Sequence, residues 1–193
     1  MQVIKYPKQK DWEILLKRPI TDFSLTERSV ADILKDIKDN GNEALRRYTL
    51  MFDKAGLDSF EVSEKEIAES ENKLSPALKQ AMQVAYNNIL AFHVSQKQVE
   101  QLVETMPGVL CWRKSIPVQK VGFYIPGGTA PLFSTVLMLG IPAKLAGCKE
   151  IVLCTPPGKN GKVNEAVLYA AGLCGITKIY KAGGAQAIAA MAY

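Results

Sequence analysis

The periodicity of the sequence changes near residue 120, and this change constrains the fold more than any other feature. From Lys120 onward, short β-rich runs alternate with apolar helical stretches. Repeated βα units predict a parallel sheet whose strands are joined by right-handed crossovers. Strands are expected at 121–125, 151–154 and 178–180, and helices at 131–146, 163–174 and from 185 onward.

The pattern before this switch is mainly helical. Residues 1–20 are expected to form an N-terminal arm that docks on another surface, and residues 21–118 a helical α+β portion. Apolar residues at i, i+3, i+4 and i+7 predict an amphipathic helix that Gly41 ends. Asn42 can cap a second helix, so the pair is expected to form an αα-hairpin.

Two further helices and a small hairpin are indicated in the same portion. Ser63 and Glu66 have capping-box spacing, and Pro76 suits the first position of a long helix. The pair Pro107-Gly108 favours a type II turn within a hairpin at 103–114. The long helix is expected to bury a narrow seam, made of Leu78, Met82, Ala85, Ile89 and Phe92. The single histidine, His93, lies beside this seam, where a packing or surface role is expected in preference to catalysis.

Composition excludes several classes of protein. The 193 residues are 48% hydrophobic, which is enough for a packed core. The longest apolar stretch, 131–143, is too short to cross a bilayer, and the first residues lack the apolar core of a signal peptide, so a cytoplasmic location is expected. The four cysteines contain no CxxC pair, and the chain has one histidine, so the sequence has no spacing typical of a zinc site. Reduced, mostly buried thiols are expected.

The formal charge of +5 lies entirely in the last segment. Residues 1–118 are balanced, whereas residues 119–193 contain seven lysines and two glutamates. The positive electrostatic potential of this segment favours an anionic ligand such as a dinucleotide. Acidic residues in missing downstream sequence are an equally good explanation of the excess. The lysines are dispersed and not interleaved with aromatic residues, which argues against nucleic-acid binding.

Three loops rich in glycine and proline follow the three expected strands, at 124–131, 155–159 and 182–186. Carboxyl ends of parallel strands meet at one edge, which is where open α/β sheets bind ligands. The first loop is not GxGxxG and, taken alone, fits a tight connection better than a ligand site. Taken together, the three loops fit a nucleotide-binding site and simple chain connections equally well. Gln186, in the first turn of the last helix, can hydrogen-bond a ribose or a carboxamide, or it is a plain surface amide.

The helix expected at 131–146 has no polar face. An apolar surface all round a helix has to be covered on more than one side. One sheet cannot cover it completely, so another domain or a second subunit is implied.

Two runs in the α/β segment carry a family resemblance: YIPGG at 124–128 and GGAQAIAA at 183–190. With the sequence around them, they closely resemble the signature region of histidinol dehydrogenase. Upstream, GNEALRRYTLMFD at 41–53 and the Pro107 hairpin also match. The resemblance covers essentially all 193 residues, as the amino-terminal part of a longer family chain.

The resemblance implies a fold, an activity and two cofactor contacts. The expected fold is α/β, with a helical N-terminal portion followed by an incomplete Rossmann-like, NAD-binding segment at 119–193. The family oxidises L-histidinol to L-histidine through histidinal, with two NAD and a zinc ion, in the last step of histidine biosynthesis. Tyr124 and Gln186 match the tyrosine and glutamine that contact NAD in the family.

The same resemblance places the catalytic apparatus outside this chain. The family's zinc ligands, acid–base residues and another NAD-contacting asparagine lie downstream, so no catalytic or metal-binding residue is expected here, and His93 matches none of them. The chain alone is expected to be inactive, and the full-length protein a homodimer. The alternative is a complete short nucleotide-binding or interaction module without catalysis, which a reading frame ending after Tyr193 would favour.

Overall fold

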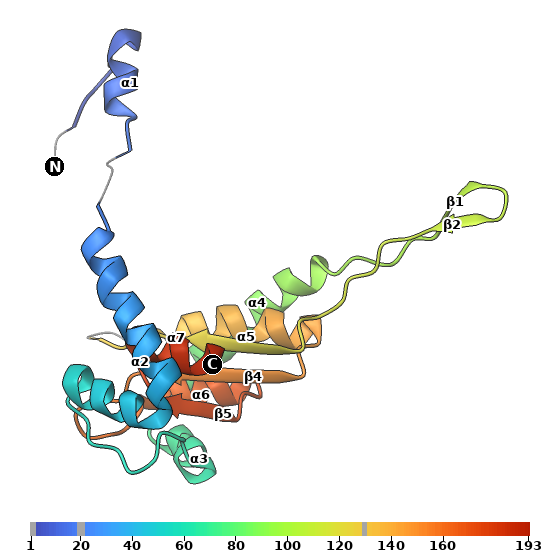
Figure 1. Ribbon diagram of the computed structural model, residues 1–193. Helices are drawn as coiled ribbons and strands as arrows, with labels where there is room; N and C mark the ends of the chain where they lie inside the picture. The colour runs from blue at the N-terminus through green and yellow to red at the C-terminus, as the bar shows by residue number, and fades with distance from the viewer. Residues whose placement is uncertain (1–2, 19–21, 129–130) are drawn as a thin grey trace.

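A parallel three-stranded sheet lies at the centre of the molecule (Figure 1). The computed structural model describes residues 3–18, 22–128 and 131–193. The strands β3 (Lys120–Tyr124), β4 (Glu150–Thr155) and β5 (Lys178–Lys181) are neighbours in sequence order, and both pairs are parallel. The predicted α/β fold with a parallel βα segment is therefore confirmed.

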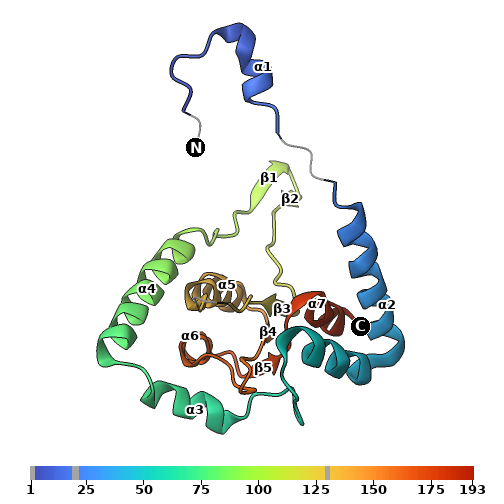
Figure 2. The same ribbon diagram turned by 90° about the vertical axis from the view of Figure 1, so that its left-hand side faces the viewer.

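Helices cover both faces of this sheet (Figure 2). On one face, α5 (Phe133–Ala146) and α6 (Glu165–Leu173) contact each other, and α7 (Gly184–Ala192) lies on the opposite face. The buried residues Val136, Leu137 and Ile141 of α5 pack in the main core. None of the described helices is long and apolar enough to cross a membrane.

The outer edge of β5 is covered by the segment around Glu61. Val62 donates its backbone N–H to the Ile179 carbonyl at 2.9 Å, and Lys181 donates to the Phe60 carbonyl at 2.7 Å. The segment forms an antiparallel bridge between Glu61 and Tyr180. The amino-terminal portion thus closes one edge of the sheet.

The first long helix changes direction at a glycine, as predicted. α2 (Ser24–Tyr48) contains Gly41 at φ 53° and ψ −129°, a backbone conformation suited to glycine, and η2 (Thr49–Asp53), a π-helix, continues it. Figure 2 shows the part after Gly41 running at an angle to the first part. The expected αα-hairpin is therefore wrong in detail, because the chain turns at this residue without the reversal that a loop would provide.

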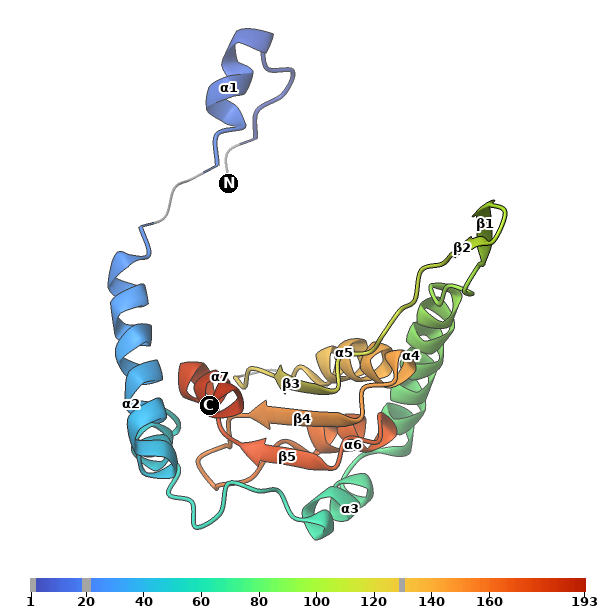
Figure 3. The ribbon, with the colours of Figure 1, turned by 45° about the vertical axis from the view of Figure 1, so that its right-hand side comes forward.

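The caps of the next two helices are confirmed. Ser63 and Glu66 form a reciprocal capping box before α3 (Glu64–Asn72), and Ser75 accepts the Leu78 N–H at the start of α4 (Pro76–Ser95). The predicted seam of α4 reaches the core at Met82 but fails at Phe92, which is 62% exposed. The last turns of α4 extend past the sheet toward the hairpin, so Phe92 has no core to enter (Figure 3).

Two segments project from the body with exposed apolar side chains. The hairpin of β1 (Val103–Met106) and β2 (Val109–Cys111) forms as expected, with Gly108 at φ 81°. Every residue of both strands is exposed. The N-terminal arm carries η1 (Gln9–Asp11) and α1 (Trp12–Leu15), and Figure 3 shows both segments away from the sheet. We expect these surfaces to be covered in a larger assembly.

The main core joins residues from both sides of position 118. Val62 and Met82 pack with Leu137, Leu153 and Ile179 in one cluster. α3 packs against α6, and α4 packs against α5. Part of the apolar surface of α5, which was predicted to need another domain or subunit, is therefore buried by α4 of this chain. The division into an arm at 1–20, a portion at 21–118 and a segment at 119–193 stays a prediction.

Candidate functional site

The three glycine- and proline-containing loops meet at the carboxyl edge of the sheet, as expected from the parallel topology. Pro156 in the second loop lies between Gly127 of the first and Gly183 of the third. A Cβ placed on either glycine would approach the Pro156 ring to 2.6 Å. Side chains at these positions would therefore push the loops apart, and glycine allows the close contact.

A hydrogen bond joins the first loop to the third. The backbone N–H of Gly184 donates to the Tyr124 hydroxyl at 3.1 Å. Tyr124 ends β3, and Gly184 begins α7 with φ 61°. The two residues are 60 positions apart in the chain, so the fold brings the Tyr124 hydroxyl to the amino end of α7.

Gln186 packs against Gly184, next to the hydrogen bond from Gly184 to Tyr124. It is the third residue of α7 and is only 1% exposed, which excludes the surface-amide interpretation. A Cβ on Gly184 would lie 2.6 Å from Gln186 Oε1, so the amide oxygen sits against the glycine. Among the described residues, Oε1 has no hydrogen-bond partner. An unpaired buried carbonyl is costly, which makes this oxygen a good acceptor for a ligand donor.

Part of the first loop lies outside the described residues, namely Thr129 and Ala130. Gly128, just before them, has φ 138° and open space where a Cβ would be. α5 begins at Phe133, two residues later than predicted, because Leu132 has a non-helical ψ of 50°. Pro131 therefore precedes the first turn of the helix and does not set it.

Two buried polar side chains were missed by sequence reasoning. Within the described residues, Thr49 Oγ1 and Asp53 Oδ2 in η2 have no hydrogen-bond partner. Burial raises the pKa of Asp53 above its ordinary value. No local motif distinguishes them from solvent-exposed positions of an amphipathic helix, so the sequence carries no signal for their burial.

An ion pair anchors the end of β5 near the third loop. Lys181 Nζ lies 2.8 Å from Glu66 Oε1, with side chains 11% and 29% exposed. Burial by itself raises the pKa of Glu66, but hydrogen bonds and charge from Lys181 and hydrogen bonds from Ser63 outweigh it and leave the pKa lowered. This ion pair links the capping box of α3 to β5, the strand that leads into the third loop.

We expect Glu66→Gln to lower the free energy of unfolding by about 1 to 2 kcal/mol at neutral pH, because Lys181 loses its charged partner while glutamine can keep the capping box. The pKa of Glu66 is lower in the folded protein than its ordinary value of 4.5. The ion pair therefore stabilises the fold fully above pH 4.5, and this stabilisation is lost as the pH falls through the folded-state pKa. Denaturant unfolding between pH 3 and pH 7 measures this difference.

The matched control is Glu69→Gln, which removes the exposed pair with Lys65 at 3.8 Å. Exposed pairs contribute little, so the control should change stability by less than about 0.5 kcal/mol. A Glu66→Gln effect that persists unchanged at pH 3 would contradict the assignment to the ion pair.

Most lysines of the basic segment lie away from the loops. Lys120 and Lys178 both pair with Glu150 at the amino edge of the sheet, where they hold its pKa below the ordinary value. Lys144 and Lys149 line a cavity of about 350 Å³ at the same edge. Of the seven lysines, Lys181 is neutralised by Glu66. Lys159 belongs to the second loop, and Lys162 lies next to it, because the Gly158 N–H donates to the Lys162 carbonyl at 2.9 Å. The charge excess is therefore divided between the amino edge of the sheet and the loops.

The cysteines are all free, and two are buried as expected. Burial raises the pKa of Cys154 and of Cys174 to about 11, so both are protonated at neutral pH. Cys148 is partly exposed and Cys111 is exposed, which corrects the expectation that most thiols are buried. In the described ranges, no group of three or more His, Cys, Asp or Glu side chains could hold a metal ion. Zinc therefore finds no fitting ligand set in this part of the chain.

The sheet, its helices on both faces and the loops at its carboxyl edge define an α/β protein of the open, parallel-sheet class. The sequence model of the histidinol dehydrogenase family matches residues 16–193. The chain belongs to the histidinol dehydrogenase family.

Individual relatives agree with this assignment. The chain is 53% identical over all 193 residues to a histidinol dehydrogenase of Bacteroides fragilis, of which it covers 45%. It is 51% identical over 182 residues to that of Photobacterium profundum, covering 94% of this chain and 40% of the relative. A crystal structure of histidinol dehydrogenase from Elizabethkingia anophelis superposes with a TM-score of 0.91 at 51% identity, over 96% of this chain and 43% of that one. The chain thus spans less than half the length of these relatives.

Proposed function

We propose that this chain is the amino-terminal part of an NAD- and zinc-dependent histidinol dehydrogenase, which oxidises L-histidinol to L-histidine through histidinal. The observation that carries the proposal is the cluster of Tyr124, Gly184 and Gln186 at the carboxyl edge, in a chain whose family match covers residues 16–193. We further propose a cytoplasmic homodimer as the full-length form.

The residues of the cluster fit a nicotinamide dinucleotide. NAD, when bound, accepts a hydride from the substrate. Gly127, Gly128 and Gly183 leave the loop backbone without side chains. The Tyr124 hydroxyl accepts the Gly184 N–H, and Gly183 has no side chain to cap the other N–H groups in the first turn of α7, so these favour a phosphate. The Tyr124 hydroxyl and Gln186 Oε1 would orient the dinucleotide by hydrogen bonds. The described residues hold no zinc site, so we assign the zinc ligands and the proton-transfer groups to downstream sequence.

We expect NAD to bind the 193-residue chain with at best about millimolar affinity, because a partial contact set has to offset the cost of immobilising the ligand. Tyr124→Ala and Gln186→Ala should each weaken binding further. Calorimetric titration or saturation-transfer NMR with NAD measures the effect.

More conservative variants separate contact from folding. Tyr124→Phe removes the hydroxyl, and Gln186→Leu keeps the buried volume while removing the acceptor oxygen. Tyr6→Phe is the matched control, since Tyr6 is 97% exposed in the arm. Micromolar binding, or binding that all variants leave unchanged, would contradict the proposed site.

A further inference from the structure

A pair of polar side chains in η2 is buried without a partner. Thr49, which begins η2, is 1% exposed, and Asp53, which ends it, is partly exposed. Within the described residues, Thr49 Oγ1 and Asp53 Oδ2 are buried atoms without a hydrogen-bond partner. An unpaired buried acceptor costs free energy, and a carboxylate costs more than a neutral group. The described residues therefore leave both oxygens without a donor.

Both side chains lie on the helix face that packs against the rest of the protein. Residues four apart share a face of a helix, so Leu45, Thr49 and Asp53 form one stripe. Leu45 packs in a buried cluster with Ala182 of the third loop and Ala187 of α7. η2 is a π-helix, a rare form that occurs frequently at functional sites. The stripe thus continues from α7 into a polar, π-helical turn.

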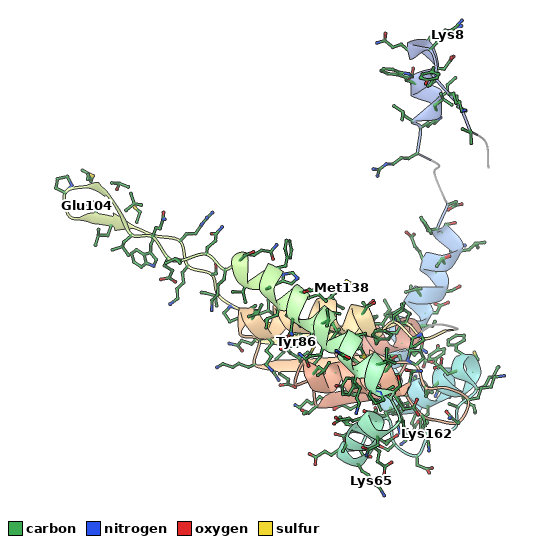
Figure 4. The ribbon with its side chains drawn as sticks, turned by 180° about the vertical axis from the view of Figure 1, so that it is seen from behind. Lys8, Lys65, Tyr86, Glu104, Met138 and Lys162 are labelled. Carbon is green, nitrogen blue, oxygen red and sulfur yellow. The ribbon has the colours of Figure 1, made fainter. Side chains whose placement is uncertain are left out.

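The second loop lies close to the end of this stripe. A Cβ on Gly161 would lie 3.3 Å from Leu57 Cδ2, four residues after Asp53. Figure 3 shows the second half of α2 on the side to which the arrowheads of β4 and β5 point. Figure 4 shows Lys162, the residue after Gly161, at the same end of the molecule. The polar pair therefore lies behind the loops at the carboxyl edge.

Basic residues near Asp53 in the chain are bound to other groups. Lys54 donates from Nζ to the Met51 carbonyl at 2.7 Å. Arg47 forms an ion pair with Asp36 at 2.9 Å. Neither offsets the burial of Asp53, which raises the pKa of its carboxyl group.

The two oxygens define the chemistry of the missing donor. One belongs to a neutral hydroxyl and the other to a single carboxylate, so one positive charge balances the pair. Divalent metal ions require more ligands, and the described residues contain no group of three or more His, Cys, Asp or Glu side chains placed for a metal. A guanidinium binds both oxygens of one carboxylate, whereas only Oδ2 of Asp53 belongs to this pair. An ammonium group has one charge and donors in several directions, which fits two separate oxygens.

We propose that Thr49 Oγ1 and Asp53 Oδ2 form a binding site for an ammonium group. The group is either a free ammonium ion from solution or the end of a lysine side chain. In this chain the lysine is Lys162, which follows the contact between Gly161 and Leu57 and, among the described residues, has no ion-pair partner. An occupied site would hold η2 against the loops. The site goes beyond the proposed function and does not rest on it.

Thermal unfolding of the 193-residue chain near neutral pH tests the free ion. Ammonium chloride is compared with sodium chloride at equal ionic strength. We expect ammonium at about 0.2 M to raise the Tm by about 2 to 4 °C relative to sodium, because an ion that binds only the folded state stabilises it. Asp53→Asn and Thr49→Val keep the side-chain shapes and should each remove this difference. Asp58→Asn and Thr26→Val, at exposed positions, are the matched controls and should keep it.

A second arm tests the lysine source. If Lys162 fills the site, the intact chain should have the same Tm in both salts. Lys162→Gln should then lower the Tm in sodium chloride, and ammonium chloride should restore it. Lys159→Gln, in the same loop, is the matched control and should show neither the loss nor the rescue.

Two outcomes would overturn the proposal. The first is that ammonium stabilises neither the intact chain nor Lys162→Gln more than sodium does. The second is an ammonium effect that persists in Asp53→Asn, because the ion would then bind elsewhere.

A measurement on the intact chain covers the case in which the variants fail to fold. In ¹⁵N NMR, ammonium chloride should shift the amides of residues 49–54 where sodium chloride does not, or the Lys162 Nζ signal should show slow exchange with water. Absence of both signals would contradict the proposed site. None of these experiments contains NAD, so failure here is distinguishable from failure of the proposed function.

Discussion

Gly183→Ala is expected to lower the free energy of unfolding by about 2 to 3 kcal/mol, because the added methyl group overpacks the junction of the three loops. Its Cβ would lie 2.6 Å from Pro156 Cβ and 3.3 Å from Pro156 Cα. A proline ring cannot rotate away, so either the second loop or the start of α7 has to move. Gly183 itself is extended, with φ −117°, so backbone strain does not contribute. Urea unfolding followed by circular dichroism measures the change.

Gly56→Ala is the matched control for this prediction. A Cβ on Gly56 meets nothing within 4 Å. The substitution should leave stability unchanged or raise it by up to about 1 kcal/mol, through the lower entropy of the unfolded chain. Equal effects of the two substitutions would show that the loops are not in tight contact.

The second large effect concerns activity. The comparison uses a chimera in which these 193 residues are continued by the remainder of the Bacteroides fragilis relative. With L-histidinol, NAD and zinc, we expect the 193-residue chain to produce NADH at a rate at least about 10⁶-fold below that of the chimera, since an enzyme without its reacting groups loses at least the acceleration typical of catalysis. The physical reason is that the described residues hold no metal-binding cluster, and His93 bonds to Gln96 in an exposed setting away from the loops.

Absorbance at 340 nm follows NADH in this assay, and the Bacteroides fragilis remainder without residues 1–193 is the control. Turnover by the 193-residue chain alone would show that the downstream part matters far less than proposed. An inactive chimera that nevertheless folds and binds zinc would argue against the assigned activity. In that case the alternative of a short binding module would gain support.

Features set by local sequence were predictable. The capping box of Ser63 and Glu66, the turn at Gly108 and the alternation of strands and helices after residue 120 all depend on residues a few positions apart. Parallel order followed from the length of the crossovers, and it correctly placed the three loops at one edge.

Features set by distant contacts were not predictable. The segment at 60–62 pairs with β5 across more than a hundred residues, and its short apolar alternation gives no indication of its partner. Gln186 is polar, and only the packing of α7 against α2 and the sheet explains its burial. Phe92 continues a perfect helical stripe, yet the core ends before it. In each case the deciding neighbour lies far away in the sequence.

The most direct test of the proposed site is to map NAD on the 193-residue chain by ¹⁵N NMR chemical shifts. We expect the shifts to concentrate at the backbone amides of Gly127, Gly128, Gly183 and Gly184 and at the side-chain amide of Gln186. Shifts concentrated instead around Lys144, Lys149 and Lys178 would contradict it. They would mean that the basic cavity at the amino edge, and not the loops at the carboxyl edge, attracts the dinucleotide.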